Sequence, residues 1–148
     1  MLCLTGGDPR PSILLVQPLK KRDLLSARSL FESSGFRVVS ASTFDEARRL
    51  IATDPPDVLV TELKLGPHNG LHLVLRSRLD HPQMPAIVMS HFADTGLAAE
   101  AARQNATFLV RPFGNSALLK AVNRGLNAAA VGPARAQRNA PSLSPKVR

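Results

Sequence analysis

Short apolar runs alternate with segments of helical hydrophobic spacing along most of this 148-residue chain. The apolar runs are rich in Val, Ile and Leu and contain few polar interruptions, which is typical of strands that are buried on both faces. They lie at 13–16, 37–41, 58–62, 86–89 and 107–110. Between and after them, apolar residues spaced three and four apart predict helices as far as about residue 130.

Local signals predict where several of these helices begin or end. Thr43, with Glu46 three residues later, has the pattern of a capping box and opens the second helix. Gly35 is placed to end the first helix, because glycine readily adopts the left-handed conformation found there. We expect Asp94 and Asn115 to cap the helices that precede and follow the last strand.

Strands that alternate with helices predict a parallel sheet covered on both faces, and right-handed crossovers then give a three-layer α/β/α sandwich with five strands. The working site of such a sheet lies beyond the carboxyl ends of its strands, at the topological switch point. The residues expected around that crevice are Gln17, Pro18, Glu62, Ser90 and Arg111.

Composition limits the class of protein and the cellular compartment that the chain can belong to. A hydrophobic content of 44% with 20% charged residues is ordinary for one soluble globular domain. No apolar run is long enough to span a membrane, and the first residues lack the apolar stretch of a signal peptide. Cys3 is the only cysteine, so no internal disulfide can form. These features together predict a cytoplasmic protein.

Three segments are expected: a flexible arm at 1–11, the folded domain at 12–130 and a disordered basic tail at 131–148. The net charge is +8, and the tail contains basic residues without any acid. These are Arg135, Arg138, Lys146 and Arg148. Such a tail can bind nucleic acid or an anionic surface, but no aromatic residue is interleaved as a stacking platform for single strands. A solvated tail is the simpler interpretation.

The residues at the strand ends resemble the receiver domain of bacterial two-component response regulators. The resemblance rests on Glu62 at a strand end, the turn at 65–70, Ser90 after the next strand, and the sequence Arg111-Pro112-Phe113. It covers roughly residues 12–129. It implies a flavodoxin-like sheet of strand order 2-1-3-4-5, with Glu62 in the place of the phosphoacceptor and a cis peptide before Pro112.

The chain departs from the family where the chemistry takes place. The resemblance implies an aspartate acceptor and an acidic pair that together bind magnesium, yet this chain has Glu62 and Gln17-Pro18 at those positions. An amide is a poor ligand for magnesium, and proline has no side-chain oxygen. Because phosphoryl transfer depends on charge neutralisation and positioning, we expect no phosphorylation, no catalytic residue and no specific magnesium binding. The histidines are scattered without ligand spacing.

Three interpretations of Glu62 stay open. It mimics a phosphorylated aspartate, it is the structural partner of Arg111, or it is a phosphoacceptor that works inefficiently in a phosphorelay. Strands three and five are about two strand spacings apart, roughly 9–10 Å, so the two charged side chains should reach each other. A mimic would also require Ser90 to point towards Glu62. It would require Phe108, at the position of an aromatic residue that rotates on activation in the family, to be turned inward.

The sequence therefore predicts a stand-alone pseudo-receiver that acts in signalling through protein–protein contact and is not an enzyme. The resemblance implies that the partner, or a second copy of the chain, binds the face formed by the helix at 97–104, the strand at 107–110 and the last helix. Its basic residues would be Arg103, Arg111, Lys120 and Arg124. The alternative from another class is binding of nucleic acid or an anionic surface by the tail, which should weaken steeply with salt.

Overall fold

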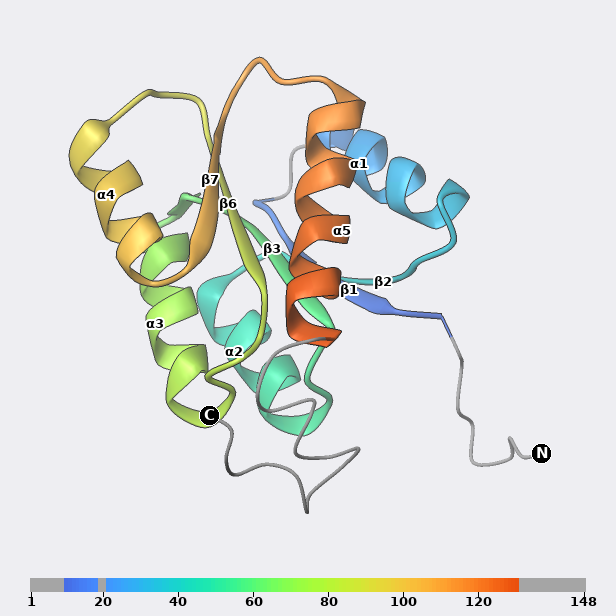
Figure 1. Cartoon of the computed structure of the whole chain (residues 1–148), viewed down its shortest axis with the longest axis horizontal. Helices are drawn as coiled ribbons and strands as arrows, with labels where there is room; N and C mark the ends of the chain where they lie inside the picture. The colour runs from blue at the N-terminus through green and yellow to red at the C-terminus, as the bar shows by residue number, and fades with distance from the viewer. Residues whose placement is uncertain (1–9, 19–20, 131–148) are drawn as a thin grey trace.

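The structure is a computed structural model that describes residues 10–18 and 21–130 (Figure 1). Most of the expected N-terminal arm, including Cys3, and all of the expected basic tail lie outside these residues. Within them, no helix is long and apolar enough to cross a membrane.

Strands and helices alternate as predicted. The strands of the main sheet are β1 (Ser12–Val16), β2 (Arg37–Ala41), β3 (Val58–Glu62), β6 (Ala86–Ser90) and β7 (Ala106–Val110). The helices are α1 (Lys21–Ser33), α2 (Phe44–Thr53), α3 (Gly70–Asp80), α4 (Thr95–Arg103) and α5 (Asn115–Ala130). Two short strands, β4 (Lys64–Leu65) and β5 (His68–Asn69), were not predicted as strands.

The five main strands form one parallel sheet in the order β2-β1-β3-β6-β7. This is the predicted order 2-1-3-4-5 once the β4–β5 pair is set aside. The pairing register places Glu62 opposite Met89, and Ser90 opposite Val110. The last residues of β3, β6 and β7 therefore lie in neighbouring positions at the carboxyl end of the sheet.

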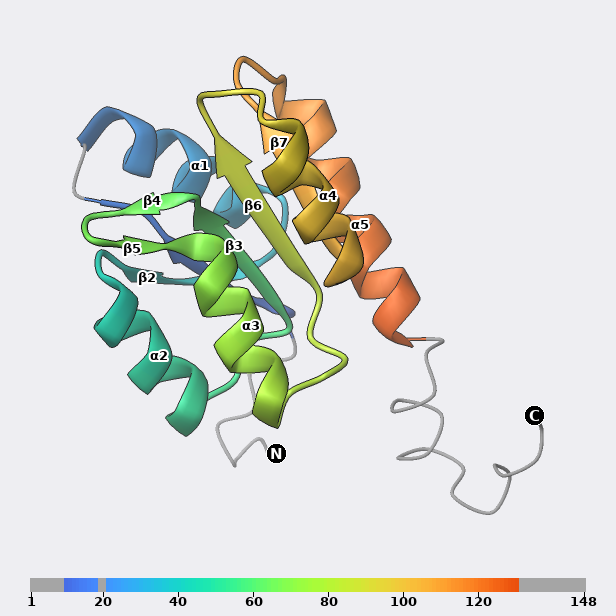
Figure 2. The same ribbon diagram turned by 90° about the vertical axis from the view of Figure 1, so that its left-hand side faces the viewer.

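Helices cover both faces of the sheet, which makes three layers (Figure 2). Successive residues of β1 belong to different core clusters, one on each face. Leu14 and Val16 belong to the core cluster that contains the buried residues of α2, α3 and α4. Ile13 and Leu15 belong to the cluster that contains Phe31 of α1 and the buried residues of α5. Burial on both faces explains why the strand sequences show no polar alternation.

The predicted helix ends are confirmed with two corrections. The Thr43 side chain accepts a hydrogen bond from the Glu46 backbone N–H, but the Glu46 carboxylate accepts from the Ser42 N–H, at 3.0 Å, and not from Thr43. Asp94 caps α4 as expected. Asn115 is not a cap: it is the first residue of α5, and the carbonyl of the preceding residue accepts the first helical hydrogen bonds.

The turn predicted after Glu62 is a small antiparallel hairpin. Lys64 pairs with Asn69, and Gly66 turns the chain with a φ of +63°, a conformation that glycine adopts without strain. The Asn69 side chain then caps α3. A Cβ on Gly70 would lie 2.1 Å from the Glu62 backbone oxygen, so only glycine allows α3 to start so close to β3. The hairpin and α3 therefore fix the backbone beside Glu62.

Candidate functional site

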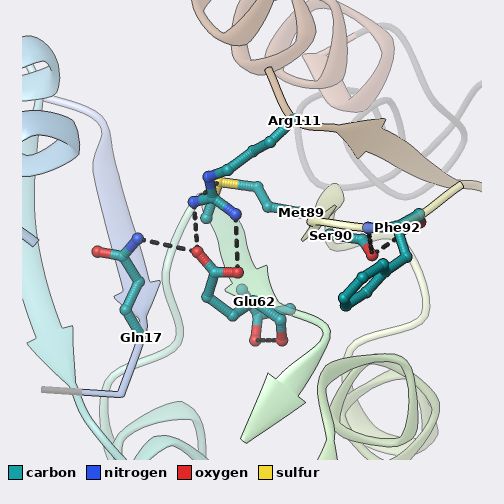
Figure 3. A network of polar contacts seen from close by, with 7 residues as sticks. Gln17, Glu62, Met89, Ser90, Phe92 and Arg111 are labelled. Atoms are coloured by element: carbon teal, nitrogen blue, oxygen red, sulfur yellow. Dashed lines mark hydrogen bonds and ion pairs between the residues drawn. The ribbon is translucent and has the colours of Figure 1, made fainter. Parts of the chain in front are cut away.

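The carboxyl ends of four strands bring most of the predicted residues together, as the topology requires (Figure 3). Gln17 follows β1, Glu62 ends β3, Ser90 ends β6 and Arg111 follows β7. Gln17, Glu62 and Ser90 are buried and Arg111 is half-buried, so the polar groups of the site are largely withdrawn from water. Groups in such a position need hydrogen-bond partners, and these partners define the site.

Glu62 and Arg111 form a bidentate ion pair across β6. Arg111 Nη1 donates to Glu62 Oε1 at 2.9 Å, and Arg111 Nη2 donates to Glu62 Oε2. The side chains are 10% exposed for Glu62 and 20% for Arg111, so the pair is shielded from solvent and salt. The prediction that the two side chains reach each other is confirmed. Such fork-to-fork pairs are among the strongest and most directional of protein hydrogen bonds.

The surroundings of Arg111 hold its guanidinium in place. Its Nη2 lies 3.8 Å from the Met89 sulfur, and its Cζ lies 5.5 Å from the centroid of the Phe113 ring. Its backbone N–H donates to the Ser90 carbonyl at 2.8 Å. The peptide between Arg111 and Pro112 is cis, as the resemblance implied. Packing and hydrogen bonding therefore direct this arginine towards Glu62.

Gln17 is the second side chain that donates a hydrogen bond to the Glu62 carboxylate. Its Nε2 donates to Glu62 Oε2 at 3.2 Å, and only 2% of the residue is exposed. Its Oε1 is buried and has no hydrogen-bond partner among the described residues. Figure 3 shows Gln17 and Arg111 approaching Glu62 from different directions. Both carboxylate oxygens are therefore already engaged by protein donors.

The residues present do not fit a magnesium ion. Magnesium requires oxygen ligands in near-octahedral geometry, and Glu62 is the one carboxylate that the described residues provide here. Its oxygens face the positive charge of Arg111, which repels a cation, and Pro18 has no side-chain oxygen. Across 10–18 and 21–130, no three His, Cys, Asp or Glu residues are grouped as metal ligands.

Ser90 belongs to the site but does not face Glu62. Its hydroxyl donates to the Phe92 carbonyl at 2.9 Å and accepts from the Phe92 N–H at 3.0 Å, which closes a tight local turn. Phe108 is half-buried against the core cluster on the α4 side of the sheet. The arrangement of Ser90 expected for a phosphoaspartate mimic is therefore absent. The geometry favours the interpretation of Glu62 as the structural partner of Arg111.

Two histidines, His68 and His72, pack against an aromatic ring. The ring of His68 stacks on that of Phe44 with centroids 4.6 Å apart, and the ring of His72 lies 5.5 Å from the same phenylalanine. This contact joins the β4–β5 hairpin and α3 to the start of α2.

A pocket of about 580 Å³ lies beside the ion pair, at the place of the crevice predicted from the strand ends, although Arg111 is not part of its lining. Its lining includes the predicted residues Gln17, Pro18, Glu62 and Ser90, together with others that we did not single out. The others include Leu63, Lys64, Met89, His91 and Phe92. Only their position in the sequence could have indicated these residues, because each lies within two residues of the end of β3 or β6.

The sequence matches the family model described as "Response regulator receiver domain" over residues 21–123. This match covers more than half of the chain and includes Glu62, Ser90 and Arg111.

Curated relatives carry the same similarity. The C4-dicarboxylate transport transcriptional regulatory protein DctD of Pseudomonas aeruginosa is 31% identical over 103 residues, which are 67% of this chain and 22% of that protein. The DNA-binding transcriptional regulator NtrC of Klebsiella pneumoniae is 29% identical over 93 residues, which are 60% of this chain and 20% of that protein. The chain thus spans about a fifth of the length of these relatives.

Solved structures share the fold. A response regulator receiver protein from Sinorhizobium medicae WSM419 is 26% identical, with a TM-score of 0.75 over 81% of this chain and 97% of that one. A response regulator receiver domain protein from Clostridium thermocellum is 24% identical and has a TM-score of 0.73 over 79% and 94% of the two chains. This second likeness supports the fold alone.

Proposed function

Because the chain belongs to the response regulator receiver family, we propose that it is a pseudo-receiver: a signalling module that acts through protein contact without a phosphoryl group on Glu62. In this proposal Glu62 takes the position of the phosphoacceptor but serves as the buried partner of Arg111. Gln17 orients Glu62, and the module catalyses no reaction of its own. Magnesium has no part in its action.

The single observation that carries this proposal is that side-chain donors already bind both carboxylate oxygens of Glu62. Arg111 and Gln17 together occupy both carboxylate oxygens, and the carboxylate is nearly buried. A phosphoryl group attached there would have to displace both donors from a site that offers no second acid.

We propose that the partner binds the face formed by α4, β7 and α5. β7 is an edge strand of the sheet, and four of its five residues are half-buried, whereas the interior strands β3 and β6 are fully buried. In Figure 1, α4 and α5 lie on either side of β7. An edge that leaves apolar side chains partly exposed is a recognised setting for protein contact.

The charge of this face is smaller than the sequence suggested. Arg111 is turned inward to Glu62, which neutralises its charge. Arg103 is exposed but paired with Glu100, and its hydrogen bond is the main reason that the pKa of Glu100 lies below the usual value. The exposed basic residues that remain are Lys120 and Arg124 on α5. We therefore expect the partner to present acidic groups opposite α5.

Charge reversal on α5 tests this face. We expect the variant Lys120→Glu/Arg124→Glu to bind its partner at least about tenfold more weakly, because two favourable charge contacts become repulsive. The matched control is Arg48→Glu/Arg49→Glu on α2, which makes the same charge change at two exposed positions on the other side of the molecule. The measurement is quantitative recovery of partners from the native host by the tagged chain, with sedimentation to measure self-association.

Both variants should melt within a few degrees of the native chain, since all four positions are exposed. If the α2 variant loses both partner recovery and self-association while the α5 variant keeps them, the assignment of the face is wrong.

A further inference from the structure

The pocket beside the ion pair has the dimensions of a small-molecule site. Its volume of about 580 Å³ falls within the range of roughly 300–1,000 Å³ typical of cavities that hold organic ligands. The ends of β1, β3 and β6 and the loops after them form its walls. Lys64, Gly66, His91 and Phe92 are exposed, so the pocket opens to solvent on their side.

Most of the wall is apolar. Pro18, Leu63, Met89 and the ring of Phe92 contribute hydrophobic surface. Phe92 is 65% exposed, one of two large hydrophobic residues described as exposed in the molecule. In Figure 3 its ring lies on the opposite side of Glu62 from Gln17. An aromatic ring left in water at the mouth of an apolar pocket can stack on a planar ligand.

The charges of the pocket favour an anion. Glu62 is the one acid among its described lining residues, and Arg111 already neutralises it. Lys64 is exposed, and its ammonium group lies 5.8 Å from the centroid of the Phe92 ring. Within the described part of the chain no carboxylate pairs with Lys64. The mouth therefore combines a cation and an aromatic ring, while the floor is electrically neutral.

We propose that this pocket binds one small aromatic anion, a planar ring system that carries a carboxylate or sulfonate. The ring would pack between Met89, Phe92 and Pro18, and the anionic group would lie beside Lys64. Binding would need neither a metal nor a phosphoryl group. The proposal goes beyond the pseudo-receiver function and does not depend on the α4–β7–α5 face, so either can fail without the other.

The test uses two fluorescent probes that differ by one charged group. The anionic probe is 1-anilinonaphthalene-8-sulfonate, and the neutral probe is N-phenyl-1-naphthylamine, which has the same rings without the sulfonate. We expect the native chain to bind one anionic probe per chain. The variant Lys64→Gln should weaken binding of the anionic probe about tenfold and leave the neutral probe within about twofold, because the variant removes only the charge contact.

The variant Phe92→Ala should weaken both probes about fivefold or more, because it removes the stacking surface. Matched controls are Arg49→Gln and Leu79→Ala, which make similar changes at exposed positions outside the pocket lining and should leave both affinities unchanged. The proposal is overturned if the folded chain binds no anionic probe. It is equally overturned if binding is insensitive to Lys64→Gln and Phe92→Ala, or if the controls reduce it as much.

Discussion

Replacing Arg111 with leucine is expected to lower the free energy of unfolding by about 3–5 kcal/mol, the typical cost of removing one partner from a buried ion pair. The Glu62 carboxylate, nearly buried in the native chain, would keep the Gln17 amide as its one remaining described donor. Removing Glu62 instead should cost less, because the longer arginine side chain can extend its guanidinium into solvent. Urea unfolding of each variant, monitored by circular dichroism, measures these differences.

The double variant Glu62→Met/Arg111→Leu distinguishes the contribution of the ion pair to stability from that of the packing around it. We expect it to recover most of the stability lost in Arg111→Leu, because no uncompensated charge stays buried. The matched control is Arg103→Leu, which breaks the exposed pair with Glu100 and should leave stability nearly unchanged. Equal effects of Arg111→Leu and Arg103→Leu would show that the buried pair is not what stabilises this edge of the sheet.

The second large expected effect is that a variant gains the ability to be phosphorylated. We expect the variant Gln17→Asp/Pro18→Asp/Glu62→Asp/Arg111→Lys to accept a phosphoryl group from acetyl phosphate in the presence of magnesium. It would supply three carboxylates at neighbouring strand ends and shorten the acceptor by one methylene. Lysine would release the bidentate hold on the acceptor while keeping the positive charge. The yield, measured by intact mass, should exceed that of Glu62→Asp alone by about a hundredfold or more.

Glu62→Asp alone is the matched control, because it restores the family acceptor and leaves Gln17, Pro18 and Arg111 unchanged. We expect no detectable product from it. Efficient phosphorylation of this single variant would mean that the acidic pair is dispensable here, and that the argument from missing magnesium ligands is wrong. Circular dichroism of both variants should match that of the native chain before the yields are compared.

The fold followed closely from the sequence because its signals were redundant. The interior strands β1, β3 and β6 are short, mostly apolar runs, and their burial on both faces leaves few other residue types compatible with these positions. The parallel order then places Glu62 and Arg111 two strands apart at the carboxyl end of the sheet, so their contact followed from strand spacing and side-chain length. The β4–β5 hairpin was harder to predict, since two-residue strands have too little periodicity to be recognised.

Local competition for hydrogen bonds explains why some contacts at the site could not be predicted from the sequence. The Ser90 hydroxyl had two possible uses, and the backbone of Phe92, only two residues away, satisfies it without any contact with Glu62. Arg111 was expected both in the crevice and on the basic face, yet one side chain occupies one place. The position of the crevice followed from the strand ends, whereas its volume and its remaining lining residues depend on side-chain packing that no sequence spacing encodes.

The native chain, incubated with acetyl phosphate with and without millimolar magnesium and then weighed intact, tests the central claim most directly. The pseudo-receiver account predicts an unchanged mass under both conditions, because Arg111 and Gln17 occupy the Glu62 carboxylate and no second acid is present to bind magnesium. A magnesium-dependent gain of one phosphoryl group that maps to Glu62 would contradict it.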